Sequence, residues 1–256
     1  MPVRAADDVE PKDWPAADFL AAARQPFLTR AWGRFSGTVQ YKSGKETVKA
    51  DLTLAVLMRA DVLRAQFVLN NVDVYDVIQA YAEDGMSNVR VTMPETVTTT
   101  PIHELGVAVE DITFSFLYWD FVEELDSQRV RGQRCRVLKL RNPQTLATAV
   151  VSFAEKYVGP LRVEFFNADG DQTRKLEFTD FEREGELYYV KGAQLRGDGW
   201  KTQVKFKTAE LAESAKKAPP ADLFLPQAQE KPADPAPAPK PVDSGPVPQE
   251  KPADQP

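Results

Sequence analysis

His103 is the single histidine of this 256-residue sequence, so acid–base chemistry near neutral pH has one obvious candidate. A catalytic histidine needs a nucleophile or an orienting carboxylate, but no Gly-x-Ser-x-Gly turn and no supported Cys–His pair accompanies His103. The only cysteine, Cys135, lies in a predicted strand, where cysteine is most often a small buried hydrophobic residue. These residues do not predict an enzyme.

A second group of polar residues has the composition of a metal site. Residues 167–171, Asn-Ala-Asp-Gly-Asp, are similar to the start of a calcium-binding loop, but Phe178 stands at the twelfth position, where such loops carry a glutamate. We therefore interpret them as a hairpin turn in which Gly170 supplies a positive φ. The sequence also has no phosphate-binding glycine loop and no zinc-type cysteine spacing, so we expect no metal and no cofactor.

The densest apolar stretch is residues 111–120, which hold four aromatic and two aliphatic residues. Alternate residues from Ile112 to Phe116 suit a strand, whereas Ile112, Phe116 and Trp119 fall on one face of a helix, so periodicity leaves both conformations open. Asp111 can cap a short helix, because its carboxylate can accept a hydrogen bond from a free N–H of the first turn. We interpret the stretch as one or two helical turns inserted into a curved sheet.

Most of the remaining chain predicts antiparallel strands joined by short turns. Glu46–Arg59 alternates most clearly, and Val62–Leu69 continues the same pattern. The sequence Asn70-Asn71 suits the tight turn of a hairpin. We expect about eleven strands and little helix, apart from residues 14–27 and a short polar helix or fraying end at 208–217.

The charge and the chain ends limit the classes of partner. The net charge of −6 argues against nucleic acid, and no run of 18 apolar residues exists to span a membrane. The first residues contain no apolar signal core, which fits either a trimmed export signal or a cytosolic start. We expect residues 1–13 to be flexible and residues 14–218 to form one domain. Residues 219–256, rich in proline and alanine with three lysines and six acidic residues, should form a disordered tail.

Several short patterns in the second half of the chain resemble one known family. They are Leu117-Tyr-Trp, Val130-Arg-Gly-Gln-Arg-Cys-Arg-Val-Leu-Lys-Leu, Gly159-Pro-Leu-Arg-Val-Glu-Phe-Phe-Asn-Ala-Asp-Gly and Leu176-Glu-Phe-Thr-Asp-Phe. Together they resemble the outer-membrane lipoprotein-sorting proteins, the LolA-like group, over roughly residues 26–207. The resemblance implies a mainly β fold, an unclosed antiparallel barrel with short helices as a lid over its apolar face.

The resemblance also implies a periplasmic, non-enzymatic carrier for the acyl chains of lipoproteins or for lipid. Inner- and outer-membrane proteins would load and receive this cargo, and we expect the carrier to be a monomer. An arginine is implied in the cavity, for which Arg34 and Arg59 are alternatives. The predicted residues of the acyl cavity and its lid are Leu52, Leu54, Val56, Met58, Phe67, Met93, Ile112, Phe114, Phe116, Leu117 and Trp119.

A second interpretation of the same residues stays open. Aromatic and aliphatic side chains at these spacings are most often plain core. The protein would then be an envelope scaffold or a protein-interaction module with a filled core, whose proline-rich tail binds a partner.

Overall fold

The computed structural model describes residues 10–28, 30–81, 87–94, 97 and 101–225. The chain divides into two compact units, Met1–Phe224 and Leu225–Pro256. Every helix and strand that the structure describes lies in the first unit.

In this unit, a pair of short helical elements precedes each of two runs of strands. The helical elements are η1 (Pro11–Asp13), α1 (Ala16–Leu28), α2 (Val109–Thr113) and η2 (Ser115–Tyr118), where η marks a 3-10 helix. The strands are β1 (Ala31–Ser43), β2 (Glu46–Met58), β3 (Val62–Leu69), β4 (Asp73–Tyr81), β5 (Ser87–Thr92), β6 (Asp120–Val130), β7 (Gln133–Arg141), β8 (Thr148–Ala154), β9 (Gly159–Phe166), β10 (Gln172–Glu184), β11 (Leu187–Gly197) and β12 (Trp200–Glu213).

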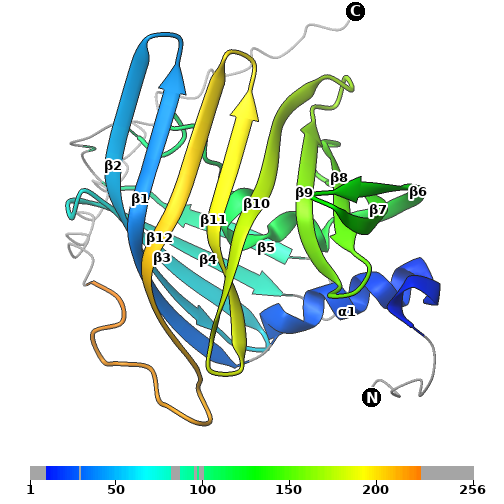
Figure 1. Cartoon of the computed structure of the whole chain (residues 1–256). Helices are drawn as coiled ribbons and strands as arrows, with labels where there is room; N and C mark the ends of the chain where they lie inside the picture. The colour runs from blue at the N-terminus through cyan, green and yellow to red at the C-terminus, as the bar shows by residue number, and fades with distance from the viewer. Residues whose placement is uncertain (1–9, 29, 82–86, 95–96, 98–100, 226–256) are drawn as a thin grey trace, which may run out of the picture. The chain divides into compact units, whose positions relative to one another are not determined.

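The strands form one antiparallel sheet in the order β5-β4-β3-β2-β1-β12-β11-β10-β9-β8-β7-β6 (Figure 1). Two meanders, β1–β5 and β6–β12, are joined where the long strands β1 and β12 pair along their length. The edge strands β5 and β6 do not pair with each other, so the sheet is not closed in the described part of the chain. This confirms the predicted unclosed antiparallel fold, with twelve strands in place of about eleven.

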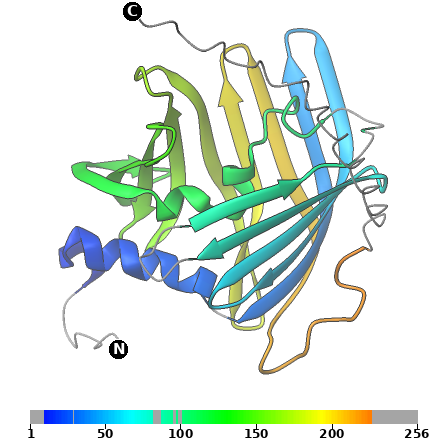
Figure 2. The same ribbon diagram turned by 180° about the vertical axis from the view of Figure 1, so that it is seen from behind.

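The inner face of the curled sheet carries the main apolar core. Figures 1 and 2 show the curl and the position of α1 beside the sheet. Helix α1 falls within one or two residues of the predicted range 14–27, and its residues Phe19, Leu20 and Ala23 share one face that is buried in this core. The ring of Phe19 meets that of Phe153 edge-on at 5.7 Å. Alternate residues of β2, among them Ala50 and Leu52, face the same core, as strand geometry requires.

The outer face carries a much smaller apolar cluster. Its buried members are Trp32 of β1, Ala55 of β2 and Leu223, which lies beyond the last strand. The indole N–H of Trp32 donates a hydrogen bond to the carbonyl oxygen of Lys217 at 2.8 Å. Residues 214–224, the outer segment, therefore fold back onto the sheet, and they include the first residues, 219–224, of the predicted tail.

The prediction of a short helix or fraying end at residues 208–217 was wrong. Residues 208–213 continue β12, and Thr208 to Glu213 pair with Ser36 to Ala31 of β1. Their polar composition gave no strand signal. The unpaired edge of the long strand β1 decides their conformation, because its backbone groups need partners.

Two predicted turns form as expected. Asn70 and Asn71 both adopt positive φ, 49° and 60°, in the hairpin between β3 and β4. Gly170 has a φ of 92° between β9 and β10, and the side-chain oxygen of Asn167 accepts a hydrogen bond from the Asp171 N–H at 2.8 Å. The calcium-like sequence is a hairpin turn.

Candidate functional site

The aromatic stretch connects the two edge strands of the sheet. It forms α2 and η2, two short helical elements separated by Phe114, which has a left-handed conformation with a φ of 55°. The prediction of one or two inserted helical turns is confirmed. We call residues 109–119 the plug.

Aromatic contacts hold the plug against the inner face of the sheet. Phe116 and Leu117 are fully buried, and Trp119 is nearly so. Both Phe116 and Trp119 meet the ring of Phe165 on β9 edge-on, at 5.6 Å and 6.2 Å. Phe114 stacks on Phe178 of β10 at 5.2 Å. The plug therefore covers the half of the sheet that contains β9 and β10.

The structure brings most of the predicted cavity and lid residues together. In the main core, Leu52, Phe67, Phe116, Leu117 and Trp119 are buried, and Leu54, Val56, Met58, Ile112 and Phe114 are partly buried against it. Met93 lies apart, with 47% of its surface exposed just beyond β5. The shared core is the arrangement that both a lined cavity and a filled core require, and the ligand-binding role of these residues stays a prediction.

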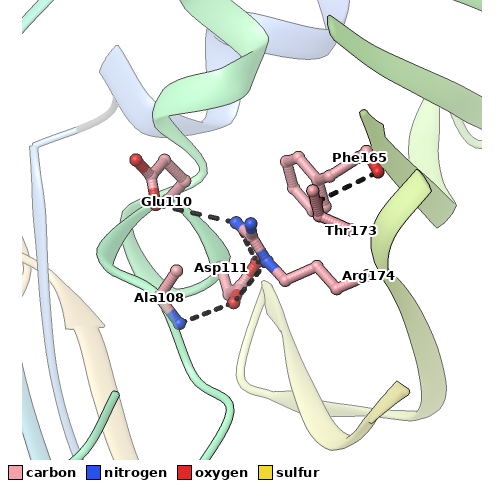
Figure 3. Close-up of polar contacts among 6 residues, drawn as sticks. All are labelled: Ala108, Glu110, Asp111, Phe165, Thr173 and Arg174. Atoms are coloured by element: carbon pink, nitrogen blue, oxygen red, sulfur yellow. Dashed lines mark hydrogen bonds and ion pairs between the residues drawn. The ribbon is translucent and has the colours of Figure 1, made fainter. Parts of the chain in front are cut away.

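An ion pair ties one end of the plug to β10 (Figure 3). Arg174 donates from Nε and Nη2 to Oδ1 of Asp111, at 3.2 Å and 3.1 Å, and its Nη2 lies 3.6 Å from a carboxylate oxygen of Glu110. The guanidinium carbon also lies 3.9 Å from the centre of the Phe165 ring. One arginine thus combines charge pairing with a cation–π contact.

Asp111 has a second partner and an unusual environment. Its Oδ2 accepts a hydrogen bond at 2.7 Å from the N–H of Ala108, the residue that precedes α2, so Asp111 contacts the cap residue from inside the first turn and does not bond a first-turn N–H as predicted. The Asp111 side chain is only 2% exposed. Burial raises the pKa of Asp111 to about 6, and the neighbouring Arg174 opposes that shift.

A second arginine holds the other end of the plug to α1. Arg24 donates from Nε to the carbonyl oxygen of Leu117 at 2.7 Å and from Nη2 to that of Trp119 at 3.4 Å. These carbonyls belong to the last turn of η2 and to its C-cap residue, where helical elements leave acceptors without internal partners. Burial lowers the pKa of Arg24, and a guanidinium stays charged despite such a shift. The plug is therefore fixed at both ends by side chains from different elements.

No known protein-family profile matches the sequence, and no curated protein is similar to it at a significant level. Several solved structures are similar in fold. A DUF1329 family protein from Desulfovibrio piger has a TM-score of 0.62 and 13% identity, over 75% of this chain and 90% of that one. A putative outer membrane lipoprotein-sorting protein domain from Vibrio parahaemolyticus has a TM-score of 0.56 and 13% identity, over 75% and 90%. A LolA superfamily protein from Nitrosomonas europaea has a TM-score of 0.56 and 9% identity, over 77% and 93%.

The chain has a LolA-like fold. The resemblance seen in the sequence is thereby confirmed at the level of fold. In this LolA-like fold the plug occupies the link between β5 and β6, and the described helices include none long and apolar enough to cross a lipid bilayer.

The two arginines proposed from sequence for the cavity lie elsewhere. Arg34 is on the outer face, where it pairs with Asp222 at 3.3 Å, and Arg59 is exposed after β2. Arg24 and Arg174 reach the plug instead. Sequence reasoning missed them because Arg24 is 93 residues from the carbonyl of Leu117 that it binds, and only the fold brings them together.

Proposed function

We propose that the protein is a non-enzymatic carrier that holds acyl chains, of lipoproteins or of lipid, against the inner face of its sheet. The observation that carries this proposal is the plug, a short insert whose buried aromatic residues cover the inner face. Displacing it would uncover a continuous apolar surface. Burial of an acyl chain stabilises a complex by about 0.8 kcal/mol per methylene before other losses, and it needs no catalytic group.

The attachment of the plug supports a lid whose middle moves while its two ends stay attached. Its ends are fixed by polar contacts of Arg24 and Arg174, whereas its middle makes contacts between aromatic rings. An acyl chain can replace ring contacts with similar dispersion contacts, but it cannot replace the paired charges. We therefore expect the ends to act as hinges and the middle to give way to the ligand.

Localisation belongs to the same proposal. The LolA-like fold and the lipoprotein-sorting description of one similar structure support a periplasmic carrier that passes cargo between inner- and outer-membrane proteins. Fractionation of cells that produce the full-length protein from its own gene tests this expectation. Recovery with the cytosolic fraction would contradict it.

Native mass spectrometry of protein purified without detergent tests the carrier directly. We expect a mass increase that matches an acyl-containing molecule, and we expect N-phenyl-1-naphthylamine, an uncharged apolar dye, to bind and be displaced by palmitate. A protein that carries no lipid and binds neither dye nor palmitate would contradict the proposal.

The complete burial of Phe116 and Leu117 favours a second candidate, a protein-interaction or envelope-scaffold module with a filled core. In that case the proline-rich residues 227–256 would bind the partner. Deleting residues 227–256 separates the two functions. A carrier keeps its palmitate binding after this deletion, whereas a module that depends on its tail loses its partner in a pull-down from cell envelopes.

A further inference from the structure

The inner face of β4 carries a polar side chain in apolar surroundings. Gln79 is fully buried, and its neighbours across the sheet are Leu63 on β3 and Val89 on β5. Both neighbours belong to the apolar core or pack against it. Within the described part of the chain, neither the amide nitrogen nor the amide oxygen of Gln79 has a hydrogen-bond partner. Because an unpaired buried amide is costly, a leucine or methionine would suit this position better if packing were its only role.

Two tyrosines extend this polar region. Tyr81 lies two residues beyond Gln79 on the same face of β4, and its ring centre is 4.7 Å from that of Tyr118 in η2. The two hydroxyl groups interact with each other closely enough to affect the pKa of both, but neither makes a hydrogen bond of standard geometry within the part of the chain that the structure describes. Burial raises the pKa of both tyrosines, so both remain hydrogen-bond donors.

A positive charge lies next to these donors. The guanidinium carbon of Arg24 is 5.4 Å from the centre of the Tyr118 ring. Its hydrogen bonds within the described chain go to the backbone carbonyls of Leu117 and Trp119, and the carboxylate of Asp120 interacts with it electrostatically and so opposes the lowering of its pKa by burial. The region therefore offers N–H and O–H donors beside a positive charge, which is the environment that an oxygen acceptor prefers.

We propose that Gln79, Tyr81 and Tyr118 form a polar subsite for the carbonyl oxygen of an acyl ligand whose chain lies on the inner face of the sheet. This inference rests on the proposed carrier function and specifies its ligand as a chain with an oxygen-bearing head. A free carboxylate and an ester present the same acceptor. Arg24 favours the carboxylate, since only that head carries a negative charge.

The subsite can be tested by measuring how well three probes displace N-phenyl-1-naphthylamine. The dye binds the apolar surface alone, so differences between probes report their own head groups. The probes are palmitate, methyl palmitate and hexadecane. In Gln79→Leu we expect palmitate to bind about tenfold more weakly, the effect of one lost hydrogen bond to a charged group, with hexadecane unchanged. An equal loss for methyl palmitate would support the subsite with an ester as its ligand, and a loss confined to palmitate would support it with a carboxylate.

Matched variants separate binding from packing. Gln66 is also buried, but it lies on the outer face and donates to the carboxylate of Asp76 at 3.3 Å. We expect Gln66→Leu to lower the melting temperature and to leave palmitate binding unchanged. Gln79→Leu should weaken palmitate binding and raise the melting temperature by about 2–4 °C, because it removes an unpaired buried amide. Tyr118→Phe should weaken palmitate binding, whereas Tyr189→Phe, whose hydroxyl donates to Glu182 at 2.7 Å, should not.

Three results would overturn the subsite. In the first, Gln79→Leu and Tyr118→Phe both bind palmitate and methyl palmitate with an affinity within twofold of wild type. Because the dye and the acyl chains still bind, this result would leave the carrier function intact. The second is a lower melting temperature in Gln79→Leu with unchanged palmitate binding, which identifies a structural water as the partner of the amide. The third is a wild-type protein that binds neither dye nor chain, which overturns the carrier function as well.

Discussion

The outer segment and the plug lie on opposite faces of the sheet. They differ in whether the polar groups around them have hydrogen-bond or ion-pair partners. The outer segment, residues 214–224, buries Leu223 in a small cluster with Trp32 and Ala55. Its polar contacts are matched, because Arg34 pairs with Asp222 and Trp32 donates to the Lys217 carbonyl. This is the pattern of a segment that completes the surface of a fold.

The plug lies on the inner face and follows a different pattern. Its aromatic residues join a far larger core, and its ends are fixed by Arg24 and Arg174. Tyr118 within the plug and Gln79 on β4 keep polar atoms without hydrogen-bond partners in the described chain. Sequences retain such unfavourable positions where function requires them. The proposed carrier function accounts for this contrast, since it assigns stability to the outer face and binding to the inner face.

Removing the central ring of the plug should produce the largest effect. In Phe116→Ala we expect the free energy of unfolding to fall by about 3–5 kcal/mol, because a fully buried ring leaves a cavity. Urea denaturation measures this change. Phe121→Ala on the edge strand β6, where the ring is 43% exposed, is the control and should stay within about 0.5 kcal/mol of wild type. Similar losses in both variants would contradict the assignment of Phe116 to the core.

Breaking the ion pair at the plug should cost nearly as much. Arg174→Met leaves the buried Asp111 carboxyl without its ion-pair partner and raises its pKa further, so the side chain either stays charged or takes up a proton, each at a cost, and we expect a loss of about 3 kcal/mol at neutral pH. Arg183→Met, which removes an exposed pair with Glu186, is the matched control and should change stability by less than about 1 kcal/mol. A loss in Arg174→Met no larger than in the control would show that the pair does not hold the plug.

Asp111 also predicts a dependence on pH. Its pKa is raised to about 6 in the folded protein, above the value of about 3.9 expected in the unfolded chain, so the folded state binds the extra proton between these values. The contribution of Asp111 to stability is therefore largest below about pH 4, and it falls by about 3 kcal/mol in total as the pH rises through 6. Urea denaturation across this range should show that decline in the wild type and lack it in Asp111→Asn. Identical profiles would contradict the raised pKa.

The outer segment should give the smallest effect. In Leu223→Ala we expect a loss of about 1–2 kcal/mol, below the usual range for a core leucine, because the cluster that surrounds Leu223 is small. Leu146→Ala, at a position 57% exposed, is the control. Palmitate binding should be unchanged in Leu223→Ala, and a weaker affinity would contradict the division of roles between the two faces.

The local pattern of the sequence was sufficient for most of the sheet. Residues 46–58 alternate so regularly that β2 differs from its expected range, Glu46–Arg59, by one residue. Asn70-Asn71 and Gly170 marked turns because their preference for positive φ is a property of the residues themselves. The same reasoning gave a wrong prediction for residues 208–213, because their strand conformation depends on pairing with β1.

The sequence by itself determined that the chain forms a β fold with one aromatic insert, because strand alternation and clusters of rings are short-range patterns. Only the tertiary structure decided that Arg24 and Arg174 hold this insert, that Arg34 belongs to the outer face, and that Gln79 lies buried beside the plug. Each of these depends on strand order and register, which place distant residues together and which no local pattern encodes.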